Sequence, residues 1–166
     1  FDDGLRTPIL ISLPGTVKPA THAQPVSSVD LLPTVLAAIG KPRAVADLPG
    51  RSLWPAAIGE SALKSEPVFG EIYPGDASSL GHPSRDIAYR WIRDGDFKLI
   101  VPHAHDGAAP WGGYLAGNAL YNVAADPDER HNLAGLDPDR VKTLRRKLDA
   151  WWTPGDEPQA PVPTEK

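Results

Sequence analysis

The clearest hydrophobic pattern in the chain is a pair of β-rich runs between Asp86 and Pro102 that flank Asp94-Gly95. Asp-Gly between two such runs predicts a β-hairpin, because a type I′ turn needs positive φ angles. A two-residue loop at this pair would place Ile92 opposite Phe97. One face of the hairpin is then apolar and requires a cover, and a loop longer by one residue would exchange the two faces.

Similar short runs predict strands at residues 68–73, 87–92, 97–101 and 119–123. After them, Asp137-Pro138 has the order of an N-cap followed by proline at the first helical position. The apolar stripe of the helix that follows is formed by Val141, Leu144, Leu148 and Trp151 or Trp152. The pattern therefore predicts an α+β fold, a small four-stranded antiparallel sheet with a C-terminal helix across it. The proline-rich tail at 154–166 is expected to be disordered.

The first 60 residues have a different character. Ile9 to Leu13 is a nearly continuous apolar run, interrupted by Ser12 and closed by Pro14-Gly15, which predicts a strand buried on both faces. Residues 28–40 predict a helix with a buried stripe formed by Leu32, Val35, Leu36 and Ile39. A two-faced strand needs neighbours that this chain scarcely supplies. We therefore interpret residues 1–60 as the last strand and helix of a truncated α/β domain, and residues 61–153 as a small C-terminal α+β subdomain.

Composition narrows the possible functions. The chain has 166 residues, of which 41% are hydrophobic and 23% charged, as in ordinary globular proteins. Its net charge of −4 and scattered basic residues argue against a nucleic-acid surface. No apolar run approaches the length of a membrane span. The absence of cysteine excludes disulfides, thiolate metal sites and a cysteine nucleophile within the chain.

Two acidic or histidine-containing clusters deserve comparison with metal sites. His103-x-His105-Asp106 could place two imidazoles on one side of an extended segment, but no further ligands follow at a familiar spacing, and a surface loop explains it better. Asp126, Asp128 and Glu129 lack the alternating ligands and the glycine of an EF-hand, which favours a turn. The chain contains no Gly-x-Ser-x-Gly nucleophile motif, P-loop, His-Glu-x-x-His zinc motif or dinucleotide-binding glycine motif. The residues of this chain alone therefore form no complete catalytic constellation.

Several segments taken together resemble the C-terminal part of a type I sulfatase, a family of the alkaline-phosphatase-like superfamily. In chain order these segments are Phe1-Asp2-Asp3-Gly4-Leu5-Arg6-Thr7-Pro8, Asp30-Leu31-Leu32-Pro33-Thr34, Gly50-Arg51-Ser52-Leu53, Arg93-Asp94-Gly95-Asp96-Phe97-Lys98-Leu99-Ile100, and Leu120-Tyr121-Asn122-Val123 with Asp126-Pro127-Asp128-Glu129 and Asn132-Leu133. Asn122 departs from the aspartate that is usual in the family. The matches run in order from residue 1 to Ala134.

The resemblance implies that the parent protein hydrolyses a sulfate ester with a formylglycine made from Cys or Ser, assisted by calcium. In the family these groups lie upstream of the segment matched by Phe1, so neither catalytic nor metal-binding residues are expected in this chain. The implied partners are an upstream large domain of the same protein and a sulfated small molecule or glycan, with neither nucleic acid nor membrane. The chain alone is then expected to be inactive. Composition leaves the compartment open, and the resemblance alone points to a periplasmic or extracellular location.

Loops of the small domain commonly line the substrate cleft in the family, which makes Glu71, Tyr73, His82 and Arg85 candidate substrate-binding residues. Packing and surface roles would explain the same four residues equally well. Two alternatives for the function remain open. One is a phosphodiesterase or phosphonate hydrolase of the same superfamily. The other is a glycan-binding module that uses Trp111, Tyr114 and the loop at 74–84.

Overall fold

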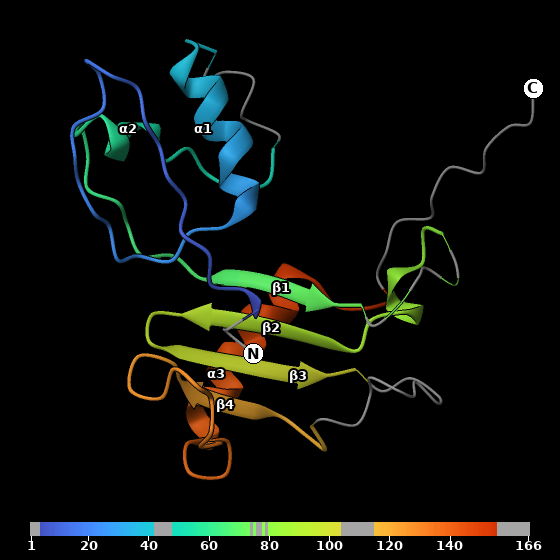
Figure 1. Ribbon diagram of the computed structural model, residues 1–166. Coiled ribbons are helices and arrows are strands. Elements are labelled where there is room, and N and C mark those ends of the chain that lie inside the picture. Colours follow the sequence, from blue (N-terminus) through green and yellow to red (C-terminus); the bar gives the residue numbers. More distant parts are fainter. Residues whose placement is uncertain are drawn as a thin grey trace, which may run out of the picture. The chain divides into compact units, whose positions relative to one another are not determined.

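The computed structural model describes residues 4–41, 48–73, 75, 78, 80–103 and 115–155. These residues form two compact units, which we describe separately (Figure 1). We call Gly4–Val68 the N-terminal unit and the described residues from Phe69 onward the sheet unit. The predicted tail, apart from Pro154 and Gly155, lies outside the described residues.

The sheet unit contains the predicted α+β fold. Its sheet has the order β1-β2-β3-β4, and neighbouring strands alternate in direction (Figure 1). A short 3-10 helix, η4, precedes β2, and helix α3 follows the sheet. The bounds of these elements are β1 (Val68–Ile72), η4 (Pro83–Arg85), β2 (Tyr89–Asp94), β3 (Phe97–Pro102), β4 (Ala119–Asn122) and α3 (Pro138–Trp151). The predicted four-stranded antiparallel sheet with a C-terminal helix is confirmed.

The hairpin between β2 and β3 turns one residue later than predicted. Its loop is Gly95-Asp96, so that Ile92 pairs with Leu99 and not with Phe97. Gly95 has a φ of 58°, whereas Asp96 has no positive φ, which is the pattern of a type II′ turn. Such a turn needs glycine only at its first central position. Because the partner of Ile92 moves by two residues, every side chain keeps the face that was predicted for it.

Helix α3 covers one face of the sheet (Figure 1). Leu144 and Leu148 of the predicted stripe are buried against Ile92, Leu99 and Leu120, and Val141 packs at the margin of this cluster. Each fully buried leucine contributes on the order of 1.5–3 kcal/mol of gross transfer free energy. The predicted role of the helix as the cover of the sheet is therefore confirmed.

The opposite face of the sheet buries an ion pair within an apolar cluster. Lys98 Nζ lies 2.9 Å from Glu129 Oε1, and the two side chains are 1% and 0% exposed. The Lys98 ammonium also lies 5.6 Å from the centre of the Trp91 ring, within reach of a cation–π interaction. Ile100 and Tyr121 belong to the buried cluster on this face. Burial, together with the carboxylates of Glu129 and Asp126, raises the pKa of Tyr121.

The N-terminal unit is organised around the buried carboxylate of Asp30. This carboxylate accepts hydrogen bonds from the backbone N–H of Ser27 at 3.0 Å and of Arg51 at 2.8 Å. The Thr34 hydroxyl donates to the Asp30 carbonyl and accepts from the Leu53 N–H at 2.8 Å. Hydrogen bonds between side chains and backbone therefore join two segments that resemble sulfatase motifs, Asp-x-x-Pro-Thr and Gly-Arg-Ser-Leu.

Gly50 permits this close approach. It has a φ of 88°, and a Cβ at this position would lie 2.5 Å from the Val29 carbonyl oxygen. A side chain here would therefore combine left-handed backbone strain with a backbone clash. The helices of the unit are η2 (Ser28–Asp30), α1 (Leu31–Ala38) and α2 (Trp54–Ala57).

Two predictions for the N-terminal unit are wrong in this structure. Residues 9–13 form no strand, because the strands among the described residues pair with one another and offer this run no partner. The expected stripe of α1 is also not buried: Leu32, Val35 and Ile39 are exposed. Helix α1 instead buries Pro33 and Thr34, and the Thr34 hydroxyl belongs to the Asp30 network. The assignment of residues 1–60 to a larger α/β domain stays a prediction.

Candidate functional site at one edge of the sheet

The alternating strands place both long connections of the sheet unit at the same end. Residues 73–88 join β1 to β2, and residues 103–118 join β3 to β4, whereas the tight turn Gly95-Asp96 lies at the other end (Figure 1). The Ala88 N–H donates to the Ile72 carbonyl at 2.8 Å, and the His103 N–H donates to the Ala88 carbonyl at 2.8 Å. These bonds hold the ends of β1 and β3 beside the start of β2. We call this end, with residues 71–73, 82–88 and 103, the loop edge.

The four predicted substrate-binding residues all belong to the segment that enters or crosses the loop edge. Glu71 lies in β1, Tyr73 follows that strand, His82 precedes η4 and Arg85 is the last residue of η4. All four are exposed. Tyr73, His82 and Arg85 thus lie on the connection from β1 to β2, Glu71 lies in β1 just before it, and all four are accessible to a ligand. Trp111, Tyr114 and residues 74, 76, 77 and 79 of the loop at 74–84 lie outside the described residues.

Hydrogen bonds hold the backbone around Arg85 in place. Pro83 stands at the first position of η4, where its fixed φ favours helix entry, and its carbonyl accepts from the N–H groups of Asp86 and Ile87, each at 3.1 Å. Ile87 is fully buried, and the Asp86 carboxylate accepts from the Ser78 N–H at 3.0 Å. The exposed guanidinium therefore projects from an anchored turn. A guanidinium in such a position suits a planar or tetrahedral anion.

Glu71 adds a carboxyl group with altered acidity. Partial desolvation raises the pKa of Glu71 above its ordinary value, although the residue as a whole is exposed. A carboxyl group with a raised pKa takes up a proton at a higher pH than an ordinary glutamate does. At the loop edge, Glu71 can then act as a hydrogen-bond donor when it is protonated.

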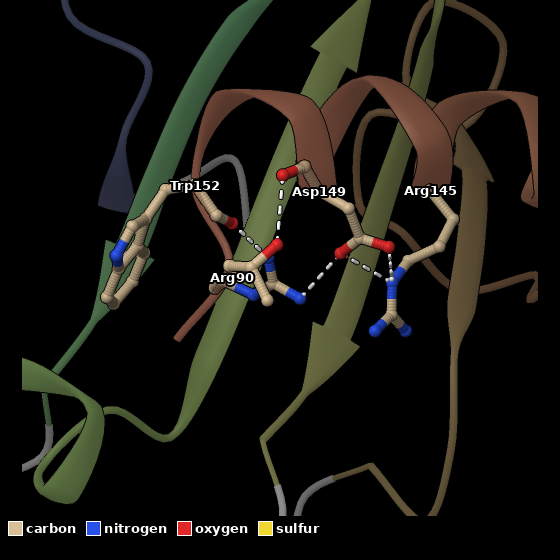
Figure 2. Close-up of polar contacts among 5 residues, drawn as sticks. Arg90, Arg145, Asp149 and Trp152 are labelled. Atoms are coloured by element: carbon tan, nitrogen blue, oxygen red, sulfur yellow. Dashed lines mark hydrogen bonds and ion pairs between the residues drawn. The ribbon is translucent and has the colours of Figure 1, made fainter. Parts of the chain in front are cut away.

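Another arginine has a purely structural position. The Arg90 side chain is 4% exposed, its Nη2 lies 2.9 Å from Asp149 Oδ1, and its Nη1 donates to the Trp152 carbonyl (Figure 2). Arg145 Nε binds both oxygens of the same carboxylate at 2.9 Å. Arg90 thus satisfies a carbonyl at the C-terminal end of α3, where backbone acceptors lack helical partners. We call Arg90, Asp149 and the Trp152 carbonyl the helix clamp.

The described residues do not fit a calcium ion. No group of three or more histidine or acidic side chains in the described part of the chain could hold a metal. The Asp126 carboxylate accepts from the His131 N–H at 2.8 Å, which lowers the pKa of Asp126, while Glu129 is committed to Lys98. His103 directly follows β3, and the other two residues of the histidine-containing cluster, His105 and Asp106, lie outside the described residues. Within the same described ranges, no helix has the length and apolarity of a membrane span.

Sequence reasoning missed the helix clamp and the Lys98–Glu129 pair. The signal for the pair was the position of Lys98 inside the apolar run from Phe97 to Val101, where a charged residue on a covered face requires a partner. The signal for the clamp was Arg90, whose side chain lies on the face that α3 covers. In neither case did the sequence name the partner, because Glu129 and Asp149 follow at separations of 31 and 59 residues.

Comparisons with known proteins agree with this fold. The chain is 28% identical to human arylsulfatase A over 161 residues, a match that covers 88% of the chain and 30% of the relative. It is 32% identical over 163 residues to the Δ4,5-hexuronate-2-O-sulfatase of Bacteroides thetaiotaomicron, with 92% of the chain and 30% of the relative covered. The crystal structure of the sulfatase-family protein YidJ from Bacteroides fragilis superimposes with a TM-score of 0.65, 19% identity and coverage of 84% of this chain and 28% of that one. No family model matches the chain.

An antiparallel sheet covered by a C-terminal helix, preceded by the Asp30 network, thus defines an α+β protein of the kind found at the C-terminus of sulfatases. The chain is related to the sulfatases and corresponds to their C-terminal portion. It spans about 30% of the length of the curated relatives described above.

Proposed function

We propose that the protein to which this chain belongs is a sulfuric ester hydrolase, and that this chain supplies one wall of its substrate cleft. The observation that supports the proposal most directly is the similarity to arylsulfatase A, which covers 88% of the chain. The relative from Bacteroides thetaiotaomicron is named as a hexuronate sulfatase. A sulfated small molecule or glycan is accordingly the proposed substrate class.

The loop edge is the proposed cleft wall. Arg85 would bind an anionic group of the substrate. Tyr73 and His82 would contact other parts of the same molecule. Glu71 would contact the substrate from the end of β1, with a pKa that partial desolvation raises above its ordinary value. The role of these residues is recognition, because none of them forms an arrangement of nucleophile and base in the described part of the chain.

The proposed catalytic groups belong to the parent protein outside this chain. They are the formylglycine nucleophile and a calcium ion, which would supply the covalent step and charge stabilisation. The chain alone is therefore expected to release no sulfate from an aryl sulfate in the presence of calcium. Turnover by the isolated chain would contradict this placement of the catalytic groups.

The test of the cleft wall is a steady-state comparison of two arginine variants of the parent protein. Arg85→Ala should raise KM for a sulfated substrate about tenfold or more, because a charged hydrogen bond is lost, and should change kcat much less. Arg130→Ala is the matched control: Arg130 is also exposed, but it follows β4 near the hairpin turn, where the Val123 N–H binds the Asp96 carbonyl. Equal effects of the two substitutions would contradict the proposed wall.

Assays with other substrates separate the proposal from its alternatives. A phosphodiesterase or phosphonate hydrolase would turn over an aryl phosphodiester or phosphonate faster than the matching aryl sulfate. A glycan-binding module would retain a sulfated glycan on the monomeric chain with no sulfate release by the parent protein. Sulfate release as the fastest of these reactions supports the proposed function.

A further inference from the structure

Helix α3 ends on β1, the strand at one edge of the sheet, with two consecutive tryptophans (Figure 1). The Trp151 ring stacks on Phe69 of β1, with ring centroids 5.1 Å apart and an angle of 10° between the ring planes. Trp152 lies edge-on to Trp151, with centroids 6.2 Å apart. Trp151 is 42% exposed, although the helical pattern makes it a candidate for the buried stripe. We call Phe69, Trp151 and Trp152 the aromatic surface.

The backbone that carries the aromatic surface is held in place. The Trp152 N–H donates to the Leu148 carbonyl at 3.1 Å, and the Trp152 carbonyl accepts from the nearly buried Arg90 (Figure 2). The stack on Phe69 orders the Trp151 ring as well. A ligand that packs on an ordered ring loses less binding free energy to the ordering of side chains.

A carboxyl group lies beside the aromatic surface on the same face of β1. Phe69 packs with the cluster under α3, whereas Ile72 packs with the cluster on the opposite face. Because successive side chains of a strand alternate between faces, Glu71 shares the face of Phe69 and lies about 7 Å further along the strand. Glu71 is exposed and belongs to the loop edge. The aromatic surface and the loop edge are therefore neighbours along β1.

The surroundings of Trp151 argue against a protein as the ligand. The residues one turn earlier on α3, Arg146 and Lys147, are exposed and charged. A stable protein interface buries about 800 Å² on each partner and depletes charged residues at its centre. One partly exposed indole ring among charged side chains does not provide such a centre. Its area suits a ligand that offers a single ring.

We propose that Trp151 stacks against one sugar ring of a sulfated glycan whose neighbouring sugar occupies the loop edge, and that Glu71 binds hydroxyl groups of this glycan. The negatively polarised face of an indole attracts the C–H bonds on the apolar face of a pyranose ring. A carboxylate accepts hydrogen bonds from hydroxyl groups. The inference rests on the proposed function for the sulfated substrate, and it narrows the substrate class to glycans of at least two sugars.

The direct test is an NMR titration of the whole chain with a sulfated tetrasaccharide prepared from heparin. The chain has 5 tryptophans, and the indole N–H signal that Trp151→Phe lacks is the signal of Trp151. This signal should shift with the tetrasaccharide and stay in place with inorganic sulfate. Trp151→Leu keeps an apolar side chain against Phe69 and should raise Kd for the tetrasaccharide about tenfold, because the stacking contact is lost. Trp151→Phe should recover part of the affinity.

The matched control is Trp54→Leu, which replaces a half-buried tryptophan of the N-terminal unit and should leave Kd unchanged. In the parent protein, kcat/KM for the tetrasaccharide is compared with kcat/KM for an aryl sulfate, which has no second sugar. The ratio of the two should fall about tenfold in Trp151→Leu and stay the same in Trp54→Leu.

Several results would overturn the glycan site. They are a Trp151 signal that does not shift with the tetrasaccharide, a shift of the same size with inorganic sulfate, and equal loss of affinity in Trp54→Leu. Self-association of the chain that Trp151→Leu abolishes would assign the aromatic surface to a second copy instead. A parent protein that binds the tetrasaccharide through Trp151 but releases no sulfate contradicts only the proposed function. Sulfate release with an unchanged ratio in Trp151→Leu contradicts only the glycan site.

Discussion

At the scale of single residues, Lys98 and Glu129 carry the most deeply buried charges among the described residues of the sheet unit. Their separation of 2.9 Å and nearly complete burial mean that each charge depends on the other, with additional support from the Trp91 ring. Removing one member of such a pair leaves an unpaired charge in a medium of low polarity, which is more damaging than removing both. The pair therefore links the turn at 123–130 to β3, and replacement of either member alone is expected to destabilise the sheet unit.

Replacement of Glu129 tests this interdependence. We expect Glu129→Gln to lower the free energy of unfolding by about 3 kcal/mol, and the double variant Lys98→Met/Glu129→Gln to recover more than half of that loss. Urea unfolding followed by tryptophan fluorescence measures both. The control is Asp128→Asn, which breaks the exposed Asp128–Arg130 ion pair and should change the free energy of unfolding by less than about 0.5 kcal/mol. Additive losses in the double variant would show that the two charges are not coupled.

Residue identity predicted the faces of the hairpin but not its turn. Ile92 and Leu99 share one face, and Trp91 and Ile100 share the other, because successive side chains of a strand alternate between faces, and this assignment survives a two-residue change of partner. The choice between a turn at Asp94-Gly95 and one at Gly95-Asp96 depends on backbone φ values that the Asp-Gly signal leaves open. The partner of Lys98 was equally beyond reach, because the sequence does not specify which distant acidic residue is brought to it.

At the scale of elements, the position of α3 on the sheet depends on the helix clamp as well as on its leucines. Arg90→Met should lower the free energy of unfolding by about 2–4 kcal/mol, since it leaves a helix-end carbonyl without its donor and removes a nearly buried charge from Asp149. Arg145→Met is the matched control, because Arg145 binds the same carboxylate from a position 40% exposed and i,i+4 along the helix. That control should lose only a few tenths of a kcal/mol. Similar losses for the two variants, measured by urea unfolding, would assign the effect to Asp149 alone.

The other end of α3 is expected to be sensitive to acid. The side-chain and backbone hydrogen bonds from Arg140 lower the pKa of Asp137 below its ordinary value of 3.8. A lowered pKa in the folded state means that the stabilisation by this group is fully present above pH 3.8 and is lost as the pH falls through the folded-state pKa. Asp137→Asn, which keeps a capping side chain, should therefore flatten the decline of stability below pH 3.8.

The measurement for Asp137 is the urea midpoint as a function of pH from 2 to 6. Asp137→Ala is the companion variant: it removes the cap altogether and should lower stability throughout this range, with the same flattening at the acid end. A decline in Asp137→Asn as steep as that of the unsubstituted chain would show that other carboxylates control the acid response.

Local sequence patterns predicted helix α3 correctly but not the conformation of the run at 9–13. The stripe of α3 and its Asp137-Pro138 entry were both predicted, because amphipathic periodicity and capping are local properties. The run at 9–13 has an equally clear apolar pattern but forms no strand, because a strand exists only when another strand pairs with it. For the loop edge, the choice of Glu71, Tyr73, His82 and Arg85 as substrate-binding residues stays a prediction, whereas the anchoring of the turn at Arg85 by Pro83 and Ile87 emerged only from the structure.

At the scale of the whole molecule, the two units should differ in resistance to opening. The sheet unit has buried clusters on both faces of its sheet, whereas the N-terminal unit exposes Leu10, Val35 and Ile39. Local opening requires less free energy where few apolar contacts are lost, and proteases cleave such regions first. A chain in which stability is divided in this way gives one resistant product and not a uniform set of fragments.

Limited proteolysis of the chain should therefore leave a resistant product that starts between residues 60 and 69 and includes Trp152, identified by intact mass. Leu148→Ala removes a fully buried side chain from the sheet unit only and is expected to destabilise it by about 2–5 kcal/mol, so that the resistant product disappears. Leu136→Ala shortens an exposed leucine of the same unit and should leave the product unchanged. Cleavage within 69–152 as fast as cleavage within 4–68 would show that the two units share one stability.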